Sequence, residues 1–335
     1  MAAVLSFLKR HSAFIGFAVV AMAAPLFTQN IYYLSVLAFM GTRFMIVLGL
    51  NLLMGQAGQI SLGHAAFAGI GAYGSAILTT RWEVNPWAAM ALSALLAATV
   101  AGVIGVPTLK LKGHYLAMGT LGFGEIVYIL LVQFKWLTNG TDGISGIPSL
   151  SLAGIDFGKP QAFHWLVWGV ALIMLRISLN LVDSRVGRSL KALHRSEAAS
   201  MSLGVNTAYR KVQVLMVSAV FASIAGSFYV HYVHFVSPSS YTLTFSVILA
   251  TTVVIGGLGR VWGAVWGSIL MMVLPEFLRQ YQDYTNLVFG VMLILIMIFL
   301  PGGIVSIGGA ADALRRRIGG ASGRSGGDAA PEGGS

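Results

Sequence analysis

Few side chains in this sequence could perform acid–base, nucleophilic or metal chemistry, and they show no catalytic spacing. His64, His114, His231 and His234 lie in or near apolar segments, but none belongs to a His-x-x-x-His pair with a helical glutamate. The chain has no cysteine, which excludes disulfides, thiolate metal sites and cysteine nucleophiles. We therefore expect no catalytic residues, no metal site and no enzyme activity of the chain's own.

One acidic side chain, Glu125, falls near the middle of an apolar segment. A carboxylate at that depth in a membrane is costly unless it is paired, protonated or facing water, so both a function and a structural hydrogen bond remain open. Arg43, in an earlier apolar segment, carries the opposite charge and could be its partner. A proton-driven carrier usually relies on several buried acids, and a single one gives that class thin support.

Two glycine-rich stretches resemble nucleotide-binding motifs but lack the sequence features that accompany such motifs. Residues 69–74 fit G-x-G-x-x-G but lie in an apolar segment with no preceding strand and no later acidic partner for a ribose. Residues 154–159 resemble a phosphate loop that is one residue short, and Pro160 stands where a Ser or Thr would bind magnesium. We expect no cofactor on this chain and no ATPase motif of its own.

The elements that position these side chains are membrane helices. The chain has 335 residues, of which 56% are hydrophobic and 10% charged, and its mean hydropathy of +0.80 excludes a soluble globular protein. Apolar runs bounded by charges, Gly, Pro or Asn predict an all-α polytopic membrane protein with about ten (8–10) transmembrane helices. The predicted segments are 12–28, 30–53, 60–79, 86–107, 113–132, 162–182, 211–236, 242–258, 262–278 and 286–302. Glycines in the third segment and at the end of the eighth predict at least one broken or re-entrant helix.

The basic excess of +10 indicates topology rather than nucleic-acid binding. With a cytoplasmic N-terminus, roughly 15 Lys and Arg fall inside and roughly 4 outside, as the positive-inside rule requires. We therefore predict a cytoplasmic N-terminus (1–11), a membrane domain (12–302) and a largely disordered cytoplasmic tail (303–335). Within the membrane domain, residues 133–161 form an extracytoplasmic loop and residues 183–210 a cytoplasmic loop.

The cytoplasmic loop predicts one short amphipathic helix. Leu190, Leu193, Ala198 and Met201 recur at near-helical spacing, and Gly204 is expected to end the helix. Such a helix could lie on the lipid surface or dock in a groove of a soluble partner. The length of the loop favours the partner.

Six sequence blocks stand in a characteristic order over most of the chain, beginning with Gly-Gln-Ala-Gly-Gln-Ile-Ser-Leu-Gly-His at residues 55–64. The blocks lie at residues 55–73, 120–126, 141–148, 187–193, 254–259 and 301–303. Together they resemble the permeases of branched-chain amino acid ABC importers, of the LivM type. The resemblance implies the ABC importer permease fold in a bacterial inner membrane, with both termini cytoplasmic.

The resemblance also implies partners. These are a second permease of the LivH type, two cytoplasmic ATPase subunits that hold ATP and Mg, and a periplasmic substrate-binding protein. The chain would gate a path for branched-chain or related hydrophobic amino acids and would do no bond chemistry. Permeases of this family also serve urea, amides and aromatic or other carboxylic acids, which remain alternatives. A proton- or ion-coupled secondary carrier is the alternative from another class.

Two sets of site residues follow from the resemblance. A Glu-Ala-Ala…Gly loop would dock on the ATPase, although the spacing to the glycine is one residue longer than usual and no Ile-x-Leu-Pro follows. The expected coupling residues are Arg188, Leu193, Glu197, Ala198, Ala199 and Gly204.

Polar side chains of the two signature regions would line the substrate path, since a zwitterion needs polar groups at lipid depth. The expected path residues are Asn51, Gln59, Ser61, His64, Thr120 and Glu125.

Overall fold

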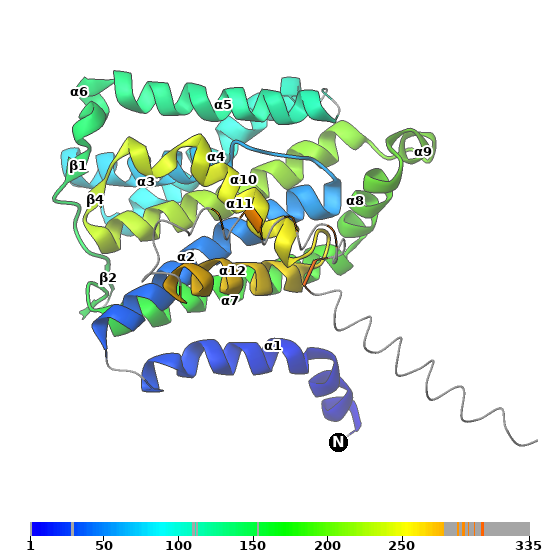
Figure 1. Ribbon diagram of the computed structural model, residues 1–335, viewed down its shortest axis with the longest axis horizontal. Helices are drawn as coiled ribbons and strands as arrows, with labels where there is room; N and C mark the ends of the chain where they lie inside the picture. The colour runs from blue at the N-terminus through cyan, green and yellow to red at the C-terminus, as the bar shows by residue number, and fades with distance from the viewer. Residues whose placement is uncertain are drawn as a thin grey trace, which may run out of the picture.

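The computed structural model describes residues 2–27, 30–108, 111, 113–152 and 154–277, together with positions 287, 290, 291, 294, 298, 303 and 304. In this part of the chain the long elements are all helices, which run roughly side by side (Figure 1). The bundle is formed by α1 (Ala2–Phe27), α2 (Ile31–Asn51), α3 (His64–Arg81), α4 (Pro86–Thr108), α5 (His114–Gln133), α7 (Pro160–Asp183), α10 (Thr207–Val233), α11 (Leu243–Gly256) and α12 (Val261–Phe277).

These helices coincide with the first nine predicted segments, and α1 extends the first one back to Ala2. By length and composition, six helical stretches among the described residues can cross a membrane. They are Ile31–Gln56, Pro86–Thr108, His114–Gln133, Pro160–Asp183, Thr207–Val233 and Pro238–Gly256. The all-α polytopic class is thus confirmed, whereas the number of about ten helices stays a prediction. Most of the tenth segment and of the tail from residue 303 lies outside the described residues.

The centre of the bundle is built on close contacts between small residues. Helix α10 packs against α3, α4 and α2, and α2 also packs against α7. A Cβ on Gly226 of α10 would collide with the backbone of Ala68 on α3, and a Cβ on Gly71 of α3 would collide with Ser223. Only glycine permits this approach, so the glycine content of the chain serves helix packing here.

Short elements close one end of the bundle. They are α6 (Lys135–Thr138), η2 (Gly140–Asp142), β1 (Ile144–Ser145), β2 (Ser151–Leu152), β3 (Ile155–Asp156), β4 (Phe235–Val236) and η3 (Pro238–Tyr241). Strand β1 pairs antiparallel with β4, and β2 with β3. The ring of His231 donates to the carbonyl of Pro148 and that of His234 to Ile147, both at 2.7 Å. The end of α10 thereby holds this loop in place.

At the opposite end, the loop between α7 and α10 folds into two helices and not one. Helix α8 (Arg185–Arg195) ends and α9 (Glu197–Ser202) begins at Ser196, whose hydroxyl accepts a hydrogen bond from the Ala199 amide at 3.2 Å. The prediction of a single amphipathic helix is therefore wrong. Leu190 and Leu193 are buried on α8, but the two later residues of the predicted apolar face are exposed on α9. The predicted end is confirmed: Gly204 follows α9 with a φ of +79°.

Candidate functional site

A buried break between α2 and α3 forms the first part of the site. After Asn51 the helix widens into the π-helical turn η1 (Leu52–Gln56), and residues 58–63 are not helical before α3 begins at His64. Two glycines allow neighbouring backbones to approach the break. A Cβ on Gly55 would collide with Gly259, and a Cβ on Gly63 would collide with the carbonyl of Thr120. The interruption expected at the glycines of the third segment is found only at Gly63. Helix α3 runs without a break through Gly69, Gly71 and Gly74, where the missing side chains instead let neighbouring residues approach closely.

Side-chain amides join this break to the loop between α11 and α12. Asn51 Nδ2 donates to the carbonyl of Arg260 at 2.7 Å, and Gln56 Nε2 donates to the carbonyl of Gly259 at 2.6 Å. Both amide side chains belong to buried residues. Asn51 Oδ1 is buried without a hydrogen-bond partner among the described residues. Polar groups at two connections between helices therefore meet inside the bundle.

The other predicted path residues surround the same break. The buried ring of His64 lies between the hydroxyl of Ser61, at 3.0 Å from Nδ1, and that of Ser218 on α10. Thr120 Oγ1 accepts from the Leu62 amide at 3.0 Å. Gln59 Nε2 donates to the nearby carbonyl of Ala57 at 2.9 Å. The structure thus brings five of the six residues together, and their role in substrate passage stays a prediction.

Glu125 does not belong to this group. It lies on the exposed face of α5, among the exposed side chains of Tyr115, Met118 and Ile126. In the described part of the chain the one ion pair within 4.0 Å joins Lys211 and Glu197, so the considered pairing of Glu125 with Arg43 does not form. Glu125 can line a path only where water or another chain covers α5.

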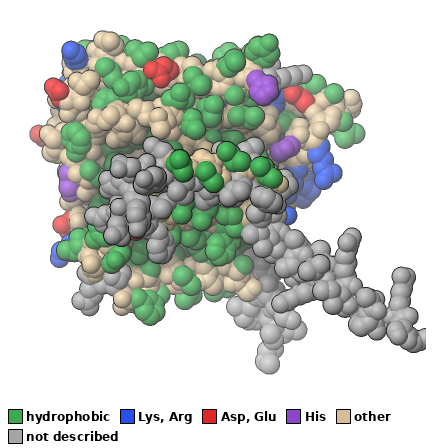
Figure 2. All heavy atoms as spheres, viewed as in Figure 1, with side chains coloured by type: hydrophobic (Ala, Val, Ile, Leu, Met, Phe, Trp, Pro, Cys, Tyr) green, Lys and Arg blue, Asp and Glu red, His purple; other side chains and the backbone are tan. Residues whose placement is uncertain are grey.

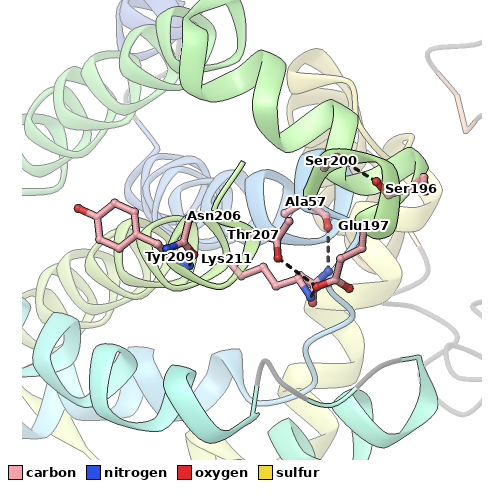
Figure 3. Close-up of polar contacts among 9 residues, drawn as sticks. Ala57, Ser196, Glu197, Ser200, Asn206, Thr207, Tyr209 and Lys211 are labelled. Atoms are coloured by element: carbon pink, nitrogen blue, oxygen red, sulfur yellow. Dashed lines mark hydrogen bonds and ion pairs between the residues drawn. The ribbon is translucent and has the colours of Figure 1, made fainter. Parts of the chain in front are cut away.

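The predicted coupling residues lie at the end of the molecule formed by α8 and α9. Glu197, the first residue of α9, has its Oε1 2.8 Å from the ammonium of Lys211 on α10. Thr207 donates to the same oxygen at 3.4 Å, and Figure 3 shows these three side chains converging. The Lys211 side chain is 3% exposed and that of Glu197 27% exposed. This ion pair fixes the start of α9 to the first turns of α10.

The remaining coupling residues divide into buried and exposed positions. Leu193 is buried in the bundle, whereas Arg188 is exposed and donates to the carbonyl of Asp183 at 3.2 Å. Three further members are exposed on or just after α9, namely Ala198, Ala199 and Gly204. Beside them the apolar side chain of Leu203 is 82% exposed. Met201 on α9 is likewise 51% exposed, so two large apolar side chains lie open at this end, and the docking role of the loop stays a prediction.

The two parts of the site touch. His194, near the end of α8, donates from Nδ1 to the carbonyl of Gly55 at 3.1 Å, and its ring packs against Gly58. His194 and Lys211 could not be recognised from the sequence, because a histidine in a polar loop and a lysine near the start of a helix give no sign of their contacts. Their partners lie on other elements of the fold. The exposed loop is therefore in direct contact with the buried helix break.

Comparisons with known proteins give a consistent result. Residues 32–297 match the family model described as branched-chain amino acid transport system / permease component. The chain is 34% identical over 281 residues to the high-affinity branched-chain amino acid transport system permease protein LivM of Escherichia coli K12, covering 77% of this chain and 66% of that protein. The chain thus matches slightly less than two thirds of that relative's length.

Two more distant relatives extend the comparison. The high-affinity branched-chain amino acid transport system permease protein LivH of Salmonella typhimurium is 23% identical over 286 residues, covering 79% of this chain and 91% of that protein. The ribose import permease protein RbsC of Escherichia coli K12 is 27% identical over 229 residues, covering 65% and 70% of the two chains. No solved structure matches this chain.

Proposed function

This chain belongs to the family of branched-chain amino acid transport system permease components, and on that premise we propose that it is the permease subunit of an ATP-driven importer of branched-chain amino acids. The name of the LivM relative supports this substrate class. The name of the ribose permease shows that the wider family also serves a chemically different substrate. The assignment to aliphatic amino acids therefore rests on the nearer relative.

The proposed assembly has a second permease similar to LivH, two ATPase subunits that bind ATP and Mg, and an external substrate-binding protein. The exposed face of α5 supports a second membrane chain. Glu125 would place a carboxylate against lipid tails on that face, which is unfavourable. A neighbouring permease that supplies polar groups or a water path removes this cost.

The observation that carries the proposal is the contact between the exposed loop and the buried break. Movement of α9 by an ATPase subunit would reach α10 through the Glu197–Lys211 ion pair. It would reach the break through α8 and the hydrogen bond from His194 to Gly55. The non-helical backbone between α2 and α3 can rearrange more readily than a continuous helix, because the helical hydrogen bonds already end there. The break would thus serve as the gate, while the ATPase subunits perform the bond chemistry.

The distribution of basic side chains supports a cytoplasmic position for α8 and α9. Arg185, Arg188, Lys191 and Arg195 are all exposed on or at the ends of α8. Figure 2 shows Lys and Arg gathered at the edge where Figure 1 places this helix. Cytoplasmic loops of membrane proteins carry such an excess. We propose that both termini face the same side, in the inner membrane of a bacterium.

The secondary-carrier alternative finds less support. Such a carrier usually relies on buried acidic groups, whereas Glu125 is exposed and is not paired with Arg43. Among the described residues, the ion pair that does form lies at the loop expected to meet the ATPase.

The test is substrate-stimulated ATPase activity in proteoliposomes that contain this chain with its second permease, ATPase subunits and binding protein. The substrates compared are leucine, isoleucine, valine, urea and an aromatic acid. We expect stimulation by aliphatic amino acids and its loss in Glu197→Arg, which places two cations side by side at the start of α9. Stimulation by urea alone would refute the substrate class, and full stimulation of the variant would refute the coupling role.

A further inference from the structure

A cavity of about 290 Å³ lies between α2, α3, α10, α11 and α12, apart from the helix break. Its walls are mostly apolar and aromatic, and include Phe39, Tyr229, Tyr241 and Phe245. Ser240, an exposed residue of η3, lines it at the end of the bundle that the proposed orientation places outside. The cavity is comparable to the smallest ligand pockets of proteins, which begin at about 300 Å³.

The one charged residue that lines this cavity among the described residues is Arg43. It lies about 18 Å along the axis of α2 from Ile31, well inside the span. It is an exposed residue and it lines the cavity. The guanidinium lies 6.0 Å from the centre of the Phe245 ring, and no carboxylate of a described residue lies within 4.0 Å of it. A cation at membrane depth that has no carboxylate partner among the described residues is costly and is a candidate for a functional role.

The chemistry of the cavity selects one kind of ligand. A guanidinium binds a carboxylate with two parallel hydrogen bonds, and this pairing gains strength away from bulk water. The apolar walls suit a short aliphatic side chain, and the faces of Tyr229 and Phe39 can receive an ammonium group. In the same wall, the buried Tyr241 hydroxyl has no hydrogen-bond partner among the described residues. Together these groups match a small amino acid with an apolar side chain.

We propose that Arg43 is a substrate-binding residue that holds the carboxylate of the transported amino acid in this cavity. The inference rests on the proposed function and adds a site distinct from the residues at the helix break. A substrate released from outside would meet Ser240 first and Arg43 deeper in the cavity. The helix break lies beyond, near the opposite end of α2, so binding and gating occupy separate levels of the bundle.

The first test is uptake of radiolabelled leucine by proteoliposomes that contain the complete transporter. Arg43→Gln removes the charge, and we expect uptake to fall at least about tenfold, since hydrogen bonds to charged groups are strong. Arg43→Lys keeps the charge without the two-pronged geometry and should retain part of the activity. Arg176→Gln is the matched control, because Arg176 lies on α7 against Phe14 and does not line the cavity. It should stay within about twofold of the wild type. Equal uptake by Arg43→Gln and the wild type would overturn the inference.

A second test needs no partner subunits and so separates this inference from the proposed function. The full chain in lipid nanodiscs is treated with phenylglyoxal, and modification of Arg43 is measured by mass spectrometry. We expect 4-methylpentanoate, which has the carboxylate, to protect Arg43. The amine 3-methylbutylamine, which lacks the carboxylate, should not protect it. Failure of Arg43 to react, or equal reaction with and without the acid, would overturn the site. Protection without leucine uptake by the wild-type complex would instead contradict the proposed substrate class.

Discussion

The Glu197–Lys211 ion pair permits a quantitative prediction about how α9 is held. Removing one partner of a fully buried pair costs about 3–5 kcal/mol, whereas exposed pairs contribute at most about 1 kcal/mol. Lys211 is buried and Glu197 keeps 27% exposure, so Glu197→Ala, which leaves the ammonium buried and unpaired, should cost about 2 kcal/mol. Lys211→Met leaves a carboxylate that water can reach, and it should cost less than about 1 kcal/mol.

The assay is hydrogen–deuterium exchange of the full chain in nanodiscs, followed at the amides of α9. A loss of about 2 kcal/mol corresponds to roughly 30-fold faster exchange for Glu197→Ala. The double variant should exchange like Lys211→Met, because it no longer buries an unpaired charge. Equal effects of the two single variants, or no effect of either, would refute this explanation of how α9 is fixed.

Three further predictions follow from single residues. Gly55→Ala forces a Cβ into the backbone of the loop between α11 and α12. Thermal unfolding should show a loss of stability of about 1–3 kcal/mol. The control Gly122→Ala should be nearly neutral, because open space surrounds Gly122. Leu203→Ser should weaken binding of the ATPase subunit about five- to tenfold in a pull-down titration, because this side chain is 82% exposed at the tip of the loop. The hydrogen bond from the Gly158 amide holds the pKa of Asp156 below its ordinary value of 3.8. The carboxylate therefore stabilises the β2–β3 turn above that pH, and this contribution disappears as the pH falls below it. The protection of the Gly158 amide, measured against its intrinsic exchange rate at each pH, should fall in acid, and this pH dependence should be lost in Asp156→Asn.

Each of these predictions has an outcome that would contradict it. A Gly55→Ala variant as stable as Gly122→Ala would show that the approach to Gly259 is not close. Unchanged binding of Leu203→Ser would move the docking surface elsewhere on the loop. An acid transition that persists in Asp156→Asn would assign the titration to another group.

Membrane helices could be predicted because each one is a continuous run of about 20 mostly apolar residues, which can be recognised in the sequence alone. The glycines of the third segment did not predict where the break lies, because Gly69, Gly71 and Gly74 stand within the continuous helix α3 and serve packing. The split of the cytoplasmic helix was not found from apolar spacing, although Ser196 before Glu197 is a local capping signal. The near-helical spacing of Leu190, Leu193, Ala198 and Met201 continues across Ser196, so it does not reveal that α8 ends there and α9 begins.

Features formed by distant segments could not be predicted. Arg43 and Phe245 are separated by about two hundred residues in sequence, so a cavity between them follows only from the packing of α2 against α11 and α12. For the same reason the exposure of Glu125 could not be predicted, because hydropathy gives the depth of a residue in the membrane but not the face of the helix on which it lies. His194 and Gly55 likewise meet only in the folded chain.

The most direct test of the central claim is uptake of radiolabelled leucine into liposomes with this chain alone, with both permeases, and with the complete set of permeases, ATPase subunits and binding protein. We predict accumulation only with the complete set and only in the presence of hydrolysable ATP. Equilibration or accumulation of leucine by this chain alone, without ATP, would contradict the account and identify the protein as an independent carrier.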